Sequence, residues 1–226
     1  SIIAGWLPLY HDMGLIGNVL QPLYLGARCI LMSPVAFLQK PLRWLRAISD
    51  YRATTSGGPN FAYDLCTKKI TAEERDTLDL SCWSVAFNGA EPVRADTLER
   101  FAEFFEPCGF KREAFYPCYG LAEATLFVSG ASVQTIDESV VGCGALKRDP
   151  EIVIVSPETF VRCAPGEVGE FLARGPYTVR GYFGVPEYWI VDEMSRSAGS
   201  LAIVDELLGA ESGMNCMETM NRAALS

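Results

Sequence analysis

Hydrophobic residues recur over the first 130 positions with two spacings, one typical of helices and one typical of buried strands. Helical spacing predicts amphipathic helices in three segments, at about 41–51, 61–70 and 98–105, with a charged turn of helix at 72–76. Short apolar runs predict buried strands in four segments, at about 27–34, 52–55, 83–87 and 113–116. Two further helices are expected, one from Leu15 and one from Leu121.

Glycine and proline interrupt this pattern where the predicted strands end. The interruptions are Ser56-Gly57-Gly58-Pro59, Asn88-Gly89-Ala90-Glu91-Pro92 and Pro117-Cys118-Tyr119-Gly120. Each stands between a predicted strand and a predicted helix, and an alternation of strand, turn and helix is typical of a parallel sheet. The sequence therefore predicts an α/β fold in which helices cover a parallel sheet.

The pattern changes after residue 130, where strands are no longer followed by long helices. Apolar runs bounded by proline and glycine predict strands at 151–155 and 167–173, which indicates a small β-rich lobe. Helix-leaning segments follow at 201–208 and 215–225. The expected organisation is a partial α/β subdomain at 1–130, a partial β-rich subdomain at 131–188 and a divergent, helical or disordered tail at 189–226.

Composition and charge exclude two broad classes of protein. The chain has 226 residues, of which 49% are hydrophobic, so it is not a disordered linker. Nineteen lysines and arginines stand against 28 aspartates and glutamates, which gives a net charge of -9. Binding to a phosphate backbone depends on a basic field, so nucleic acid is not expected as a partner.

Cysteine usage and apolar run length bear on the compartment. The eight cysteines form no Cys-x-x-Cys pair and there is one histidine, so neither a zinc site nor a disulfide framework is expected. No apolar run reaches the roughly 18 residues that span a bilayer, and the first residues do not resemble a signal peptide. We therefore expect a cytoplasmic protein without a membrane span. Because the chain begins with Ser1 and apolar sequence, we also expect it to be part of a longer protein.

Candidate chemistry lies in the glycine-containing turns, because ligands of an open parallel sheet bind beyond the carboxyl ends of its strands. The small residues around Gly89 let a flat base approach the backbone. Tyr119 adds an aromatic ring, and Glu123 adds a carboxylate that suits magnesium. The histidine, His11, lies between apolar residues and a glycine. Taken singly, each feature also has a structural explanation, as a turn, a helix cap or a satisfied polar side chain.

Four sequence blocks, in this order, carry a resemblance to a known superfamily. They are GWLPLYHDMGLIG at 5–17, TSGGPNFAY at 55–63, FNGAEPV at 87–93 and YPCYGLAEAT at 116–125. Together they resemble the adenylate-forming superfamily of acyl and aryl acid ligases. Residues 4 to about 170 most resemble its fatty acyl-AMP ligase branch.

The resemblance implies a reaction in two steps. A fatty acid carboxylate attacks the α-phosphate of ATP, which gives acyl-adenylate and releases pyrophosphate. The acyl group then passes to the phosphopantetheine arm of an acyl carrier protein or of a polyketide synthase carrier domain. ATP and Mg2+ are the implied cofactors, and a fatty acid and a carrier protein are the implied partners.

The resemblance also implies roles for residues in the nucleotide half of the site. Gly89, Ala90 and Glu91 would line the adenine. Tyr119 would stack on the adenine, and Gly120 would leave room for the α-phosphate. The last two blocks are therefore expected to form the cofactor-binding site.

Further roles are implied for the metal, the acyl group and the reacting carboxylate. Glu123 would coordinate magnesium. His11 would be the catalytic residue, beside the acyl carboxylate and the mixed anhydride, where an imidazole can position oxygens as charge develops. Residues expected near the acyl entrance are Met13, Gly58 and Asn60.

Parts of the family pattern do not occur in this chain. No Ser/Thr/Gly-rich phosphate loop precedes His11, and neither the Thr-Gly-Asp segment nor the C-terminal domain with its catalytic lysine follows. The segment between Ser129 and Val140 is short for this branch, residues 174–183 are closer to the aryl-acid branch, and the resemblance ends beyond Glu187. We therefore expect the chain alone to be inactive. The alternatives are a non-catalytic module that binds adenylate or acyl groups, and an acyl-CoA or aryl-acid ligase.

Overall fold

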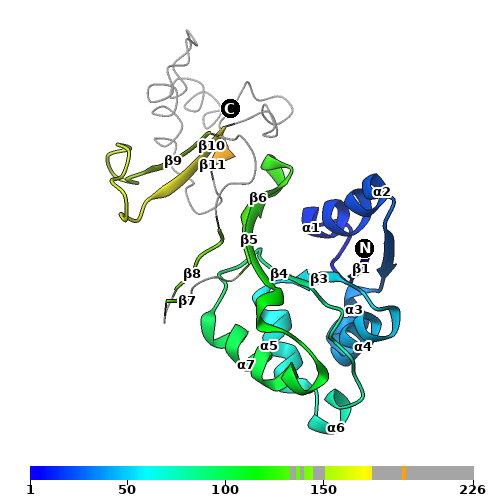
Figure 1. Ribbon diagram of the computed structural model, residues 1–226. Helices are drawn as coiled ribbons and strands as arrows, with labels where there is room; N and C mark the ends of the chain where they lie inside the picture. The colour runs from blue at the N-terminus through cyan, green and yellow to red at the C-terminus, as the bar shows by residue number, and fades with distance from the viewer. Residues whose placement is uncertain (133–135, 138–139, 145–150, 175–189, 192–226) are drawn as a thin grey trace. The chain divides into compact units, whose positions relative to one another are not determined.

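Figure 1 shows the computed structural model of the chain, which describes residues 1–132, 136–137, 140–144, 151–174 and 190–191. The chain forms two compact units. One comprises residues 1–122 and 126–147, and the other comprises residues 123–125 and 148–226. Among the described residues, no helix combines the length and apolar character needed to cross a membrane.

The first unit is built on one sheet. Its strands are β1 (Ile2–Gly5), β2 (Arg28–Leu31), β3 (Thr55–Gly58), β4 (Val85–Asn88), β5 (Phe115–Leu121) and β6 (Leu126–Gly130). They lie in the order β2-β1-β3-β4-β5-β6, and every neighbouring pair is parallel except β5 and β6. The expected parallel sheet is confirmed, with one antiparallel strand added at its edge.

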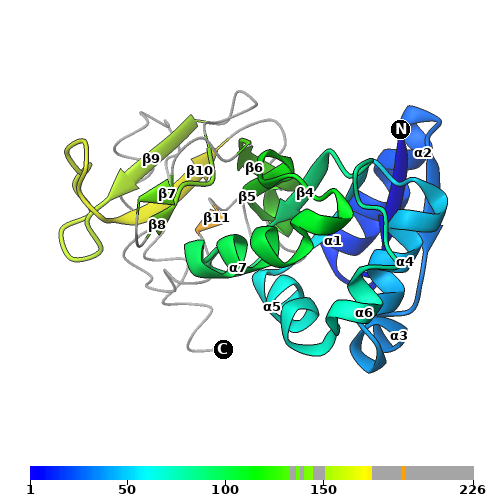
Figure 2. The same cartoon turned by 60° about the horizontal axis from the view of Figure 1, so that its bottom comes forward.

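Helices follow the strands and cover the sheet. They are α1 (Asp12–Leu15), the π-helix η1 (Ile16–Leu20), α2 (Gln21–Leu25), α3 (Pro34–Gln39), α4 (Leu42–Tyr51), α5 (Asn60–Lys69), α6 (Ala72–Arg75) and α7 (Ala95–Phe105), with 3-10 turns η2 (Glu106–Cys108), η3 (Arg112–Ala114) and η4 (Ala122–Ala124). Figures 1 and 2 show α4, α5 and α7 along one face of the sheet and α1 and α2 towards the other. The helices predicted at 41–51, 61–70, 72–76 and 98–105 are confirmed as α4, α5, α6 and α7.

An aromatic cluster forms the centre of the core under these helices. Its rings, with neighbouring centroids 5.1 to 6.3 Å apart, belong to Trp44, Tyr63, Trp83 and Phe101. Buried indole N–H groups need acceptors. Trp44 Nε1 donates to Ser56 Oγ at 2.8 Å, and the Ser56 hydroxyl donates to the Ala4 carbonyl at 2.6 Å. Packing and buried hydrogen bonds therefore join α4 to both β3 and β1.

The strand predicted at 52–55 is wrong in position. β3 begins at Thr55 and runs through two glycines to Gly58, whereas Arg52 ends α4 in a left-handed conformation with φ 54°. Glycine is required within β3 because a Cβ at Gly57 would lie 2.1 Å from the Phe87 carbonyl oxygen of β4. Sequence pattern treats glycine as a strand breaker and misses its use where two backbones approach closely.

The helix predicted from Leu121 is also wrong. β5 continues through Leu121, and after η4 the chain returns as β6, antiparallel to β5. Thr125 and Leu126 have φ angles of 56° and 73°, which a right-handed helix excludes. A Cβ at Gly120 would lie 1.6 Å from the Leu126 carbonyl oxygen, so the two strands can approach only because residue 120 is glycine.

Short strands beyond residue 130 make two small sheets. In the first unit, β7 (Ile136–Asp137) pairs with β8 (Val140–Val141). In the second unit, β9 (Glu151–Val155), β10 (Glu170–Arg174) and β11 (Ile190–Val191) form an antiparallel sheet in the order β11-β10-β9. The expected β-rich lobe is confirmed, although β10 begins at Glu170 and not at residue 167.

Two expectations for the later part of the chain stay predictions. The helix-leaning segments at 201–208 and 215–225 lie outside the described residues. The two compact units do not test the division into subdomains at 1–130, 131–188 and 189–226, because the chain passes between these units at other residues.

The close approach of β3 and β4 gives a stability prediction. Gly57→Ala places a methyl group against backbone that has to move, so we expect a loss of about 3 kcal/mol in the free energy of unfolding. Gly26→Ala is the matched control, because Gly26 has φ +63° and nothing within 4 Å of an added Cβ. Its cost, from the left-handed backbone alone, is about 1 kcal/mol. Urea unfolding measures both, and equal costs would contradict the packing of β3 on β4.

Candidate functional site

The predicted site residues follow, or lie in, neighbouring parallel strands of the sheet. β1 ends at Gly5 and leads to His11, β3 ends at Gly58 and leads to Asn60, and β4 ends at Asn88 and leads to Gly89, Ala90 and Glu91. β5 continues past its pairing with β4, and this extension holds Tyr119 and Gly120. Because parallel strands end at one edge of a sheet, the structure brings these segments to the same edge.

The 89–94 loop, which joins β4 to α7, has a strained backbone. Ala90 has φ 69°, a conformation that alanine rarely adopts and that costs on the order of 1 to 3 kcal/mol. A Cβ at Gly89 would lie 2.7 Å from the Cys118 carbonyl oxygen, so the loop packs closely on β5. The small residues noticed in the sequence thus serve this approach to β5, and contact with a base stays a prediction.

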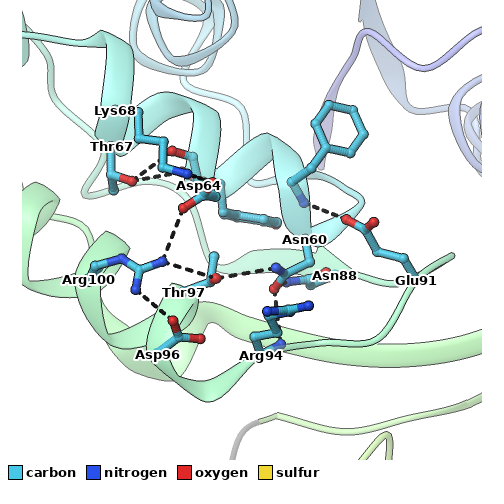
Figure 3. Close-up of polar contacts among 12 residues, drawn as sticks. Asn60, Asp64, Thr67, Lys68, Asn88, Glu91, Arg94, Asp96, Thr97 and Arg100 are labelled. Carbon is cyan, nitrogen blue, oxygen red and sulfur yellow. Dashed lines mark hydrogen bonds and ion pairs between the residues drawn. The ribbon is translucent and has the colours of Figure 1, made fainter.

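The Glu91 carboxylate is engaged with the protein. It accepts the backbone N–H of Phe61, the second residue of α5, in the contact drawn in Figure 3. Pro59, the N-cap of α5, makes no side-chain cap, so Glu91 supplies from another element the acceptor that a helix N-terminus needs. The carboxylate of Glu91 therefore has a structural role. Only the backbone of Glu91 is left to contact the adenine, and that contact stays a prediction.

Asn60 lies at the centre of a buried polar network (Figure 3). The residue is 6% exposed. Its Oδ1 accepts Asn88 Nδ2 at 3.3 Å and the backbone N–H of Arg94 at 3.1 Å, and its Nδ2 donates to Thr97 Oγ1 at 3.3 Å. Asn60 therefore links the start of α5 to the end of β4 and to the start of α7. The expected contact with an acyl chain stays a prediction, and these bonds give the side chain a structural role.

Charged residues continue this network towards the surface (Figure 3). Arg100 donates to Thr97 Oγ1 at 3.4 Å and pairs with Asp64 at 3.1 Å and with Asp96 at 2.6 Å. Asp64 also pairs with Lys68 at 2.6 Å. Exposed pairs of this kind contribute little to stability, but they connect α5 to α7.

Tyr119 and Gly120 stand at an irregularity of the sheet. The pairing of β5 with β6 shifts register between them, so that Tyr119 faces Ser129 and Gly120 faces Phe127. A β-bulge redirects the side chains next to it and is common beside binding sites. The half-buried Tyr119 stands directly at this register shift.

His11 and Asp12 form the polar pair after β1. Asp12 Oδ1 lies 2.6 Å from His11 Nδ1 and 2.7 Å from the backbone nitrogen of Met13. Met13 N also lies 3.2 Å from His11 Nδ1, but that nitrogen cannot accept this N–H and donate to Asp12 at once. The shorter contacts indicate that His11 Nδ1–H donates a hydrogen bond to Asp12 and that the Met13 N–H donates to the same carboxylate. Nε2 is then the ring nitrogen that can meet a ligand, from a side chain that is 51% exposed.

The other residues predicted at the acyl entrance are closely packed. Met13 is 7% exposed and belongs to the hydrophobic core. A Cβ at Gly58 would lie 2.6 Å from Cζ2 of Trp6, whose indole stacks on Phe37 with ring centroids 4.0 Å apart. Both positions are packed in the core after β1 and β3, and their contact with an acyl chain stays a prediction.

Glu123, the predicted magnesium ligand, lies in η4, four residues after Tyr119 in the chain. Residues 123–125 belong to the second compact unit. Within the described ranges, no group of three or more His, Cys, Asp and Glu side chains is arranged to hold a metal ion. Mg2+ is commonly held by one or two carboxylates together with substrate phosphates, so a single carboxylate fits a metal that arrives with ATP.

Cys118 lies beneath the 89–94 loop and has an unreactive thiol. Burial, together with a smaller effect of the neighbouring Cys143, raises the pKa of its thiol to about 12. Its Sγ lies 3.5 Å from the Asn88 carbonyl oxygen. The thiol therefore stays protonated at neutral pH and acts as packing between β4 and β5.

Three residues of the site are not singled out by the sequence analysis. Asn88 is fully buried and donates to Asn60, Arg94 presents its backbone N–H to the same residue, and Asp12 contacts His11. Asn88 precedes Gly89 and was interpreted only as part of a strand-breaking turn. The signal available was an amide side chain at the end of a buried strand, where a buried polar group needs a partner.

Comparison with known proteins identifies the class. The profile of the family described as AMP-binding enzyme matches residues 1–183. The chain belongs to this family of AMP-binding enzymes. The fold agrees, because the structure matches that of a fatty acyl-adenylate ligase from L. pneumophila, solved in complex with acyl adenylate and pyrophosphate, with TM-score 0.76 and 45% sequence identity over 82% of this chain and 37% of that one.

Similar proteins of assigned activity narrow the class. A medium-chain fatty acid acyl-carrier-protein ligase, TtuA of Teredinibacter turnerae, is 45% identical over 83% of this chain and 33% of its own length. The ligase JamA of Moorena producens, with the same description, is 44% identical over 81% of this chain and 36% of its own length. The chain thus spans about a third of the length of these relatives, and its resemblance to fatty acid-activating ligases is confirmed.

The environment of Cys118 predicts how its thiol reacts. The thiolate is the species that is alkylated, and with a pKa of about 12 its thiolate fraction at pH 8 is about 1 in 10,000. We expect iodoacetamide at pH 8 to modify the partly exposed Cys163 and to leave Cys118 unmodified until the protein is denatured, as measured by peptide mass mapping. Equal labelling of the two in the folded protein would contradict the packing of β5 under the loop.

Proposed function

We propose that this chain carries the acid-activating site of a fatty acyl-AMP ligase. The supporting observation is that four segments matching the family's motifs meet at the carboxyl edge of one parallel sheet. The similar proteins named above act on fatty acids, and one was solved with an acyl adenylate and pyrophosphate. The proposed reaction joins a fatty acid to the AMP part of ATP.

In the proposed reaction, one oxygen of the fatty acid carboxylate forms a bond to the α-phosphorus of ATP. The bond from that phosphorus to the bridging oxygen of the β-phosphate breaks, and pyrophosphate leaves with the electron pair. No strong base is needed, because the carboxylate is already ionised. Catalysis then depends on holding two anions in line and on stabilising charge on the phosphate oxygens.

His11 would act on the reacting oxygens. With its Nδ1 proton directed to Asp12, the ring is held in one orientation and Nε2 faces outward. When protonated, Nε2 can donate to a carboxylate or phosphate oxygen. Asp12 would thus be a positioning residue for His11.

Nucleotide binding would use the backbone of the 89–94 loop, with Tyr119 stacked on the purine. Glu123 would hold Mg2+, which neutralises phosphate charge when it is bound with ATP. An acidic protein with net charge -9 can bind ATP at such a site, because nearby hydrogen-bond donors and the metal determine the electrostatic field at the phosphates.

The acceptor of the acyl group is proposed from the relatives, which are described as acyl-carrier-protein ligases. We propose the phosphopantetheine arm of a carrier protein, or of a polyketide synthase carrier domain, and a cytoplasmic location. Transfer to coenzyme A, activation of an aryl acid and binding without catalysis are the competing possibilities, and the experiment below separates them.

Exchange of labelled pyrophosphate into ATP tests the function directly. We expect the full-length protein to catalyse the exchange with Mg2+ and octanoate or palmitate, and to need neither coenzyme A nor a carrier. Exchange only with dihydroxybenzoate would indicate an aryl-acid ligase. Binding of an adenylate analogue without exchange for any acid would indicate a non-catalytic module and contradict the proposal. Product formed afterwards with coenzyme A or with a carrier protein identifies the acceptor.

Tyr119 gives a second test, of the nucleotide site itself. In the full-length protein, Tyr119→Ala should weaken ATP binding by about 1 to 3 kcal/mol, the range for the loss of one aromatic stack on a base. Tyr119→Phe keeps the ring and should bind ATP nearly as the natural protein does. Titration calorimetry measures both, and an unchanged affinity in the alanine variant would remove Tyr119 from the adenine site.

A further inference from the structure

The 89–94 loop is tied at three points to the first two residues of α5. At its entry, the Asn88 side chain donates to Asn60 Oδ1, and at its exit the Arg94 N–H donates to the same oxygen. Between these, the Glu91 carboxylate accepts the N–H of Phe61. The loop cannot shift along α5 without breaking these bonds.

The ties act on a loop that is strained. Ala90, inside the loop, has φ 69°, and Gly89 packs against the backbone of Cys118 in β5. Strained backbone persists only where surrounding structure determines its conformation, and it is concentrated at functional sites. In this loop the determining contacts come from α5 and β5.

Asn60 supplies two of the three ties with a single atom. Its Oδ1 accepts two hydrogen bonds, which uses both lone pairs of that oxygen. Its Nδ2 donates to the buried Thr97, and the residue is 6% exposed. The carboxamide oxygen therefore has no capacity left for a ligand, and one N–H of the amide is directed to Thr97.

We propose that Asn60 is a positioning residue for nucleotide binding: its carboxamide holds the 89–94 loop in the strained conformation that presents the backbone of Gly89, Ala90 and Glu91 to the purine. Asn60 accordingly acts on the affinity for ATP, and it does not contact the acyl chain. The inference rests on the proposed function, because that function makes the loop a nucleotide site.

Two substitutions at Asn60 separate positioning from loss of packing. Asn60→Leu keeps a similar volume and removes the oxygen that accepts from Asn88 and Arg94. Asn60→Asp keeps both acceptor positions, and the Thr97 hydroxyl can turn to donate to the new carboxylate. Thr97→Val is the matched control, because it removes the one partner of Asn60 that does not belong to the loop or its entry.

Steady-state kinetics and amide hydrogen exchange of the full-length variants test the proposal. For Asn60→Leu we expect faster exchange of the amides of residues 89–94 and a KM for ATP raised about tenfold, the effect of losing one to two hydrogen bonds, with the KM for fatty acid unchanged. Asn60→Asp and Thr97→Val should keep both the loop exchange and the KM for ATP near the natural values. If Asn60→Leu does not fold, Asn88→Ala removes the entry tie alone and should raise the KM for ATP by a smaller factor.

The proposal would be overturned if Asn60→Leu changed the KM for fatty acid and not the KM for ATP. A raised KM for fatty acid with an unchanged KM for ATP would make Asn60 an acyl contact, and unchanged exchange of the loop amides would mean that the loop holds itself. Failure of the natural protein to bind ATP would instead remove the proposed function. In that case faster loop exchange in Asn60→Leu but not in Asn60→Asp would still support the positioning role, and equal exchange in both would end it.

Discussion

The hydrogen bonds of one buried carboxamide, that of Asn60, hold together the part of the molecule on which the site depends. β4 ends at Asn88, α7 begins at Ala95, and the six residues between them carry the predicted adenine contacts. Most of this connection is exposed, and without helix or strand of its own it would sample many conformations if nothing held it. Asn60 fixes both of its ends from a third element, and the Glu91 carboxylate fixes its middle.

The fold makes this arrangement possible by combining an apolar interior with a polar edge. Trp44, Tyr63, Trp83 and Phe101 fill the space under α4, α5 and α7, and the Tyr63 hydroxyl donates to the Phe87 carbonyl at 2.7 Å, one residue before Asn88. α5 therefore has two functions. One face packs in the core, and its first turn binds the loop. Any change that moves α5 in the core is expected to reach the nucleotide site through these bonds.

Local sequence pattern predicts the longer helices well because their apolar spacing repeats over several turns, as Leu42, Leu45 and Ile48 do in α4. It failed where one close contact decides the structure. Gly57 and Gly120 were interpreted as breaks, although both lie in strands that need a residue without a side chain. β1, only four residues long, was not predicted because the apolar sequence after it hides its end.

The candidate site was predicted from the order of its motifs, and its internal connections were not. Gly89 follows β4 and Tyr119 lies in β5, and the sequence pattern predicts both strands, whereas His11 follows β1, which it does not predict. The bonds of Asn60 reach residues 28 to 37 positions away, and no local pattern indicates such partners. The expectation that Asn60 lies near the acyl entrance comes from the resemblance alone and stays a prediction, and the structure adds the buried network around its side chain.

The most direct test of the account is titration calorimetry of the full-length protein with a long-chain acyl sulfamoyl adenosine, which mimics the acyl-adenylate. The account predicts saturable binding of one molecule per chain, with affinity that falls sharply when either adenosine alone or the fatty acid alone is used. Absence of binding to a folded protein, or binding that does not need the adenosine part, would contradict the assignment of a nucleotide site to the edge of this sheet.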